Sequence, residues 1–96
     1  MNLITRFLRI ERNRLKQEGY KGLNSDVIFF LNKELGTRYQ QGRVKEWERG
    51  ERRPSVETHN HILKRVLTYE LKKNGLAEDV IGDIIQKTQL PEAMKK

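Results

Sequence analysis

Apolar residues recur along this chain with the spacing of one helical face, in five stretches that glycine or proline separates. No run alternates apolar and polar residues with the period of a β-strand. The expected helices cover about residues 2–18, 24–35, 40–49, 56–73 and 77–87. The sequence therefore predicts an all-α fold, a compact five-helix bundle.

Residues at the ends of these stretches favour helix starts and stops. Asn24 or Ser25 can cap the second helix, because either side chain can accept a hydrogen bond from a backbone N–H of the first turn. Gly36 can close the same helix in the left-handed conformation that glycine adopts without strain. Pro54 and Ser55 form a stop followed by a cap, so they predict the start of the fourth helix.

The length predicts a single domain over residues 1–89, followed by a loose tail at residues 90–96. The chain has no cysteine, which excludes disulfides and thiolate sites and fits a reducing compartment. No uncharged segment reaches the length of about 18 residues that a membrane span needs, and arginines interrupt the apolar residues near the N-terminus. We therefore expect no membrane span and no secretory signal, and a cytoplasmic location.

The charge of the chain is unevenly distributed. It carries 20 Lys and Arg against 13 Asp and Glu, a formal net charge of +7. Residues 1–53 hold 13 of the basic and 7 of the acidic residues, whereas residues 54–96 hold 7 and 6. Such a field favours encounter with a polyanion if the basic side chains face phosphates. The alternative is a solvated surface that is basic for solubility, and only the position of these residues distinguishes the two.

One segment carries a recognisable motif. Residues 44–55 read Val-Lys-Glu-Trp-Glu-Arg-Gly-Glu-Arg-Arg-Pro-Ser. This segment resembles the end of the DNA-binding domain of phage repressor/Cro-type helix-turn-helix regulators, where an aliphatic residue, an aromatic residue three positions later and Glu-x-Gly precede a basic stretch and Pro-Ser. The resemblance covers roughly residues 23–67. It implies a lambda-repressor-like domain in which the second and third helices form a helix-turn-helix.

The length of one connection and two residues, Asn32 and Glu48, bear on this resemblance. The connection between Gly36 and Val44 is about two residues longer than usual in that family, and Asn32 stands near the position of a small alanine. The resemblance also implies that Glu48 pairs with an arginine of the first helix, for which Arg12 and Arg14 are candidates; the alternative is a solvated carboxylate.

The third helix predicts a surface that could read DNA. Val44 and Trp47 are three residues apart, so we expect both to face the core and to leave polar residues on the opposite side. Arg, Lys, Gln and Glu side chains match the donors and acceptors of the major groove. The predicted base-contacting residues are Gln40, Gln41, Gly42, Arg43, Lys45 and Glu46. The predicted phosphate-contacting residues are Arg38, Arg49, Arg52 and Arg53.

The expected function is a sequence-specific double-stranded DNA-binding regulator of transcription. The resemblance implies a small phage or mobile-element repressor that binds an inverted repeat as a homodimer. The fifth helix is more apolar than a peripheral helix needs, so its isoleucines either close the core or meet a second subunit. We predict a dimer interface at Ile81, Ile84 and Ile85.

Other functions fit the sequence less well. An antitoxin-like protein-interaction module is the main alternative, but few residues remain after the fifth helix to bind a partner. RNA binding would need exposed aromatic rings, whereas we expect Trp47, Phe29 and Phe30 to be buried. His59 and His61 are two residues apart on a helix and point in different directions, so no metal site is expected. We expect no enzyme activity, no cofactor and no small-molecule ligand.

Overall fold

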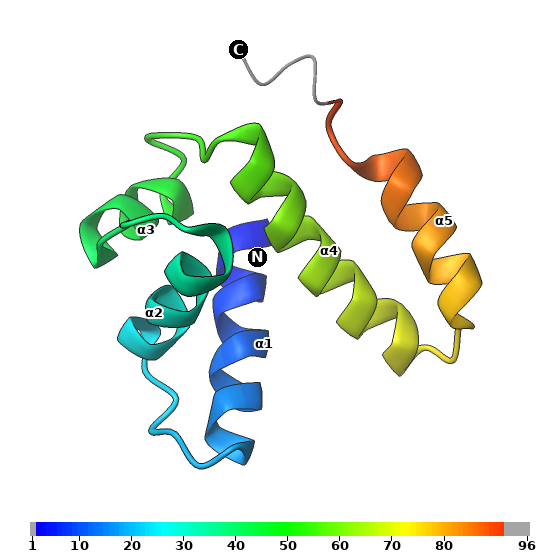
Figure 1. Ribbon diagram of the computed structural model, residues 1–96, viewed down its shortest axis with the longest axis horizontal. Coiled ribbons are helices and arrows are strands. Elements are labelled where there is room, and N and C mark those ends of the chain that lie inside the picture. The colour runs from blue at the N-terminus through cyan, green and yellow to red at the C-terminus, as the bar shows by residue number, and fades with distance from the viewer. Residues whose placement is uncertain (1, 92–96) are drawn as a thin grey trace. The chain divides into compact units, whose positions relative to one another are not determined.

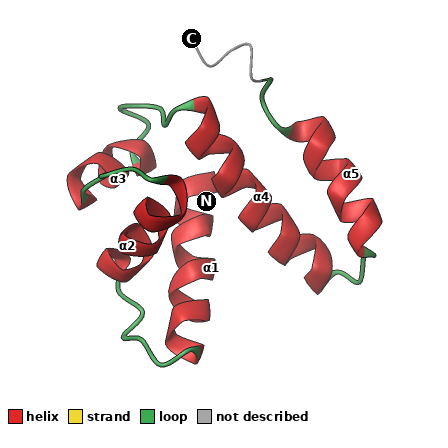
Figure 2. Cartoon of the chain, viewed as in Figure 1, coloured by secondary structure: helices red, strands yellow, loops and turns green. Residues whose placement is uncertain are grey.

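The computed structural model describes residues 2–91, and these residues form an all-helical structure with five helices and no strand (Figure 1). Figure 2 shows the helices and the loops that connect them. The helices are α1 (Leu3–Gln17), α2 (Asn24–Leu35), α3 (Gln41–Glu48), α4 (Val56–Lys73) and α5 (Glu78–Thr88). The predicted all-α fold is confirmed, and each helix begins and ends within about two residues of its expected bounds.

Helix caps explain most of these bounds. Ser55 caps α4 as expected, because its hydroxyl accepts a hydrogen bond from the backbone N–H of Thr58. Gly36 ends α2 in the left-handed conformation, with φ of 67°. The start of α2 differs from the prediction: Leu23, not Asn24 or Ser25, is the N-cap residue. A leucine side chain cannot accept a hydrogen bond, so the stabilising contact comes from Asp26, whose carboxylate accepts from the N–H of Leu23 at 3.0 Å.

The chain divides into two compact units, residues 1–53 with α1 to α3 and residues 54–96 with α4 and α5. The boundary at Pro54 coincides with the change in charge along the sequence, so unit 1 carries nearly all of the positive excess. Whether residues 1–89 form a single domain depends on how these two units associate, so the expected single domain stays a prediction.

Unit 1 is built around the apolar faces of three helices. Helix α1 packs against α2 and α3, and α2 packs against α3. The buried apolar side chains are Ile4, Phe7, Leu8, Ile10, Leu15, Val27, Ile28, Leu31, Val44 and Trp47. One carboxylate, Glu11, is buried among them, and Arg14 lies one turn further along α1 and forms an ion pair with it at 3.1 Å. The hydrogen bonds with Glu11 raise the pKa of the Arg14 guanidinium above its usual value.

In unit 2, α4 packs against α5. Ile81 and Ile85 of α5 are buried and, with Lys64 and Thr68 of α4, line a small hollow between the two helices. Ile84 is half-buried. The expected dimer interface at Ile81, Ile84 and Ile85 stays a prediction. A spacing of four residues places Ile81 and Ile85 on one side of the helix, and the packed side is the one that faces α4.

The end of α5 is held more firmly than expected. Leu90, placed by the sequence in a loose tail, exchanges two hydrogen bonds of 2.8 Å with the side-chain amide of Asn60 on α4. The amide of Gln89 donates to the backbone carbonyl of Asn60 at 3.4 Å. Residues 92–96 of the expected tail lie outside the described residues. Of the five helices found in the described part of the chain, none combines the length and the apolar character that crossing a membrane requires.

Candidate nucleic-acid interface

Helix α3 is fixed by the two residues that the sequence singled out. Val44 is 4% exposed and Trp47 is 5% exposed, so the predicted orientation of α3 is confirmed. The Trp47 ring also contacts Tyr39 of the preceding turn edge to face, with the ring centroids 4.7 Å apart. Since the core side of α3 is occupied, its other side faces solvent: Gln41, Gly42, Arg43 and Lys45 are exposed, and Glu46 is partly exposed.

The end of α3 is tied to the start of α1 by polar contacts. The Asn2 side chain caps α1 by accepting from the N–H of Thr5, and its amide donates to the backbone carbonyl of Glu48 at 2.6 Å. The Glu48 carboxylate accepts from the hydroxyl of Thr5 at 3.1 Å. The expected pairing of Glu48 with an arginine is wrong. Arg14 instead pairs with Glu11 of its own helix and with the C-cap residue Glu18, and Arg12 donates to the side chain of Asn24.

The turn between α2 and α3 is organised by one side chain. The Asn32 carbonyl oxygen accepts from the hydroxyl of Thr37 and from the N–H of Tyr39, both at 2.8 Å. Its amide nitrogen donates to the carbonyl of Tyr39 at 2.8 Å. Asn32 therefore satisfies both backbone groups of Tyr39, which a turn of this length cannot satisfy with helical hydrogen bonds. The two departures from the resembled pattern, the longer turn and Asn32, are therefore related: the Asn32 side chain supplies the hydrogen bonds that the longer turn needs.

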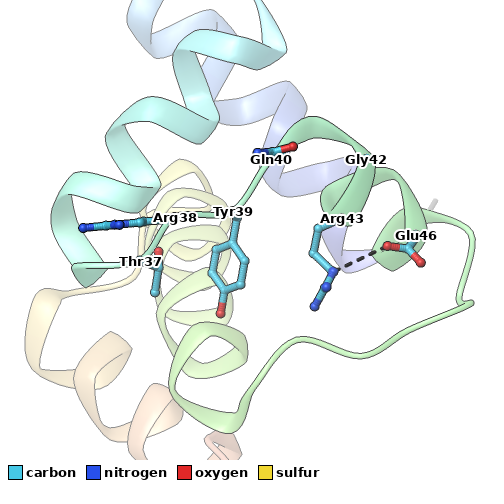
Figure 3. A pocket seen from close by; sticks show the side chains of 7 residues that line it. All are labelled: Thr37, Arg38, Tyr39, Gln40, Gly42, Arg43 and Glu46. Carbon is cyan, nitrogen blue, oxygen red and sulfur yellow. Dashed lines mark ion pairs between the residues drawn. The ribbon is translucent and has the colours of Figure 1, made fainter.

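A shallow hollow of about 580 Å³ opens where this turn meets α3 (Figure 3). Arg43 and Glu46 project into it from the same side of α3, and Tyr39 projects from the turn. The lining residues are Thr37, Arg38, Tyr39, Gln40, Gly42, Arg43 and Glu46. The hollow thus brings together four of the six predicted base-contacting residues, Gln40, Gly42, Arg43 and Glu46, and one predicted phosphate-contacting residue, Arg38.

Glu46 has partners that the sequence did not indicate. Its carboxylate lies 3.4 Å from Nε of Arg43 and 3.7 Å from Nε of Arg52, and its side chain is 33% exposed. Arg43 is one turn earlier on α3, whereas Arg52 belongs to the loop that follows α3. Exposed pairs of this kind contribute little to stability. The pairs instead keep two arginines beside the Glu46 carboxylate and neutralise part of their charge.

The remaining predicted phosphate-contacting residues lie at or after the C-terminal end of α3. Arg49 is the C-cap residue and pairs with Glu51 at 2.9 Å, while Arg53 is exposed. Arg38, by contrast, lies in the turn before α3. The structure therefore places basic side chains before and after a short helix whose outer side is polar, which is the distribution that a helix in the major groove needs between two phosphate strands.

Two aromatic residues differ from the expectation that they are buried. Phe29 is 61% exposed and Phe30 is half-buried, because the core side of α2 is already formed by Val27, Ile28 and Leu31. Trp47 is buried as expected, so it is not available for stacking on a base. The two phenylalanines lie on α2 and do not line the hollow at α3.

Sequence reasoning missed Asn32, Thr37 and Tyr39 as residues that shape this site. The available signal was the added length of the turn, since extra backbone groups near a packed helix need hydrogen-bond partners. It also missed Glu51, whose position two residues after Arg49 was visible in the sequence. Within the described residues, no group of three or more His, Cys, Asp or Glu side chains is arranged to hold a metal ion.

Comparison of this chain with models of protein families, with curated proteins and with solved structures finds no match.

Proposed function

We propose that this protein is a sequence-specific double-stranded DNA-binding regulator of transcription, in which α3 is the recognition helix. The observation that carries the proposal is the burial of Val44 and Trp47, which leaves the polar side of α3 exposed on the unit that holds most of the positive charge. A helix fixed from one side and polar on the other fits the width of the major groove. The helix-turn-helix and the resemblance to phage repressors are parts of this proposal.

The proposal assigns different tasks to α3 and to the loop that follows it. Gln40, Gln41 and Arg43 lie at the N-terminal end of α3 and Lys45 in its last turn, and these four residues would read base edges. Amide and guanidinium groups can form two hydrogen bonds with adenine and guanine respectively. Arg52 and Arg53 follow the helix and would contact phosphates. A homodimer would bind an inverted repeat and repress transcription by occupying the promoter.

Selection of bound duplexes from a random library tests the proposal most directly. We expect enrichment of an inverted repeat, because each protomer would read one half-site and the spacing of the half-sites would follow the symmetry of the dimer. A matched selection with random single-stranded RNA serves as the control. Failure to enrich any duplex, or stronger enrichment of RNA, would contradict the proposal.

Replacing Glu46 with glutamine should change DNA binding in two ways. The preference at one base pair should weaken by about 1–3 kcal/mol, because the neutral amide accepts from cytosine more weakly than the carboxylate does and can also donate to other bases. Binding to random-sequence duplexes should become several-fold tighter, because Arg43 and Arg52 lose the carboxylate that now neutralises them. Fluorescence anisotropy with a selected duplex and a scrambled duplex measures both effects.

The variant Gln41→Ala is the matched control for this prediction. Gln41 is exposed on α3 and carries no charge, so its loss should weaken the preference for the selected sequence and leave random-sequence binding unchanged. If Glu46→Gln binds random-sequence duplexes as wild type does, the ion pairs of Glu46 do not reduce the contribution of Arg43 and Arg52 to DNA binding.

Replacing Arg52 and Arg53 together with alanine should weaken binding to every duplex. If both side chains neutralise phosphates, the slope of log affinity against log salt should become shallower by up to about 2. The double variant Lys72→Ala with Lys73→Ala is the control, since it removes two adjacent cations from unit 2 and leaves the net charge the same as in the test variant. Equal slopes for the two double variants would show that Arg52 and Arg53 do not contact phosphates.

A further inference from the structure

The outer side of α2 and the loop before it carry an exposed aromatic surface, which we call the α2 patch: Tyr20, Leu23, Phe29 and Phe30. The rings form a connected group. Phe30 contacts Tyr20 on one side and Phe29 on the other, each edge to face with centroids 5.2 Å apart. A contiguous apolar surface exposed to water on a small protein commonly marks a site of interaction.

Two opposite charges border this patch along α2. Asp26 and Lys33 are seven residues apart, so they share one side of the helix and are separated by about 10 Å along its axis. Phe29 and Phe30 lie midway between them on the same side. This side is opposite to the buried stripe of Val27, Ile28 and Leu31. The outer side of α2 thus has an acidic end, an aromatic centre and a basic end.

We propose that the α2 patch binds the same patch of a second copy of the chain, with the two α2 helices antiparallel. A two-fold axis through the aromatic centre brings Asp26 of each copy to Lys33 of the other, and Phe29 and Phe30 of both copies into contact. A parallel arrangement would place like charges together. In the antiparallel arrangement the positive end of each helix dipole also lies beside the negative end of the other.

A second copy fits this surface better than a nucleic acid does. The carboxylate of Asp26 repels phosphates. In the symmetric pairing, by contrast, the Asp26 of each copy lies beside the Lys33 of the other copy, so each end of the interface joins opposite charges. Asp26 uses one oxygen to accept from the N–H of Leu23, which leaves the other oxygen for a lysine. One helix side covers less than the roughly 800 Å² per partner of a standard interface, so the dimer is expected to form reversibly.

This inference gives the homodimer of the proposed function a surface, and it is tested without DNA. Sedimentation velocity over about two orders of magnitude in protein concentration measures self-association of the full chain. The wild-type protein should pass from monomer to dimer, and Phe29→Ser should stay monomeric. The control is Tyr69→Ser, which removes another exposed aromatic side chain (45% exposed) on α4 and should leave the dimer intact.

A charge-swap experiment tests the antiparallel geometry. Asp26→Lys and Lys33→Glu should each dimerise at least ten-fold more weakly than wild type, because each variant places like charges at both ends of the interface. An equimolar mixture of the two variants should dimerise again, because every contact then joins opposite charges. Since Asp26→Lys also removes a helix-capping contact, circular dichroism of each variant checks that the helices are retained.

Several outcomes would overturn the inference. A wild-type chain that stays monomeric throughout would exclude the dimer, and a Phe29→Ser chain that dimerises as wild type does would exclude the α2 patch. Loss of the dimer in Ile84→Ser but not in Phe29→Ser would assign the interface to α5. A mixture of the charge variants that stays monomeric would exclude the antiparallel pairing. None of these results depends on whether the protein binds DNA.

Discussion

Replacing Trp47 with alanine should lower the free energy of unfolding by about 3–5 kcal/mol. Trp47 is almost fully buried, contacts the Tyr39 ring and is one of only two buried residues of α3 in the described structure. Its removal would leave a cavity and would detach α3 from the core of unit 1. Urea denaturation followed by circular dichroism measures the change.

The control for Trp47 is Phe29→Ala, another aromatic substitution in unit 1. Because Phe29 is largely exposed, its replacement should change the free energy of unfolding by about 0.5 kcal/mol or less, measured at a protein concentration at which the chain is monomeric. Equal destabilisation by the two substitutions would mean that Trp47 is not the anchor of α3. If Trp47→Ala still reads a selected duplex as well as wild type does, α3 is not the recognition helix.

Replacing Asn32 with alanine should lower the free energy of unfolding by about 2–3 kcal/mol. The substitution removes three hydrogen bonds and leaves the N–H and C=O of Tyr39 without their side-chain partner in a partly buried turn. The first turn of α3 would lose its fixed position relative to α2, so sequence-specific binding should weaken more than random-sequence binding. Urea denaturation and anisotropy with selected and scrambled duplexes measure the two effects.

Two further variants separate the contributions of the Asn32 side chain. Asn32→Asp keeps the acceptor for the N–H of Tyr39 but cannot donate to its carbonyl, so it should fall between alanine and wild type. Thr37→Val removes only the hydroxyl contact and should cost about 1 kcal/mol. An Asn32→Ala chain as stable as wild type would show that the turn does not depend on this side chain.

Local patterns in the sequence were sufficient to predict the helices. The apolar spacing and the cap at Ser55 predicted bounds that the structure confirms within about two residues, because both act over neighbouring residues. The inward orientation of Val44 and Trp47 was predictable for the same reason. On α2 and α5, however, the apolar residues outnumber the positions that the core can cover. The pattern alone therefore could not show that Phe29 is exposed or that Ile81 and Ile85 are buried within the chain.

The partners of polar side chains were much harder to predict. Glu48 accepts from Thr5, which is 43 residues away, and not from an arginine. Glu46 contacts Arg43 through helical spacing, but its contact with Arg52 depends on how the loop after α3 turns back. Whether a charged side chain is available to a ligand depends on such contacts, and the candidate site is correspondingly less predictable than the fold.

The sequence by itself determined that residues 2–91 form five helices, that one side of α3 is apolar and that the basic residues gather before Pro54. These features arise from backbone propensity, helical period and composition, all of which are properties of neighbouring residues. Only the tertiary structure decided that Asn32 holds the turn before α3, that Glu46 lies between two arginines and that Phe29 faces solvent. Hydrogen bonds, ion pairs and burial depend on which distant segments come together, and the packing of the helices sets that.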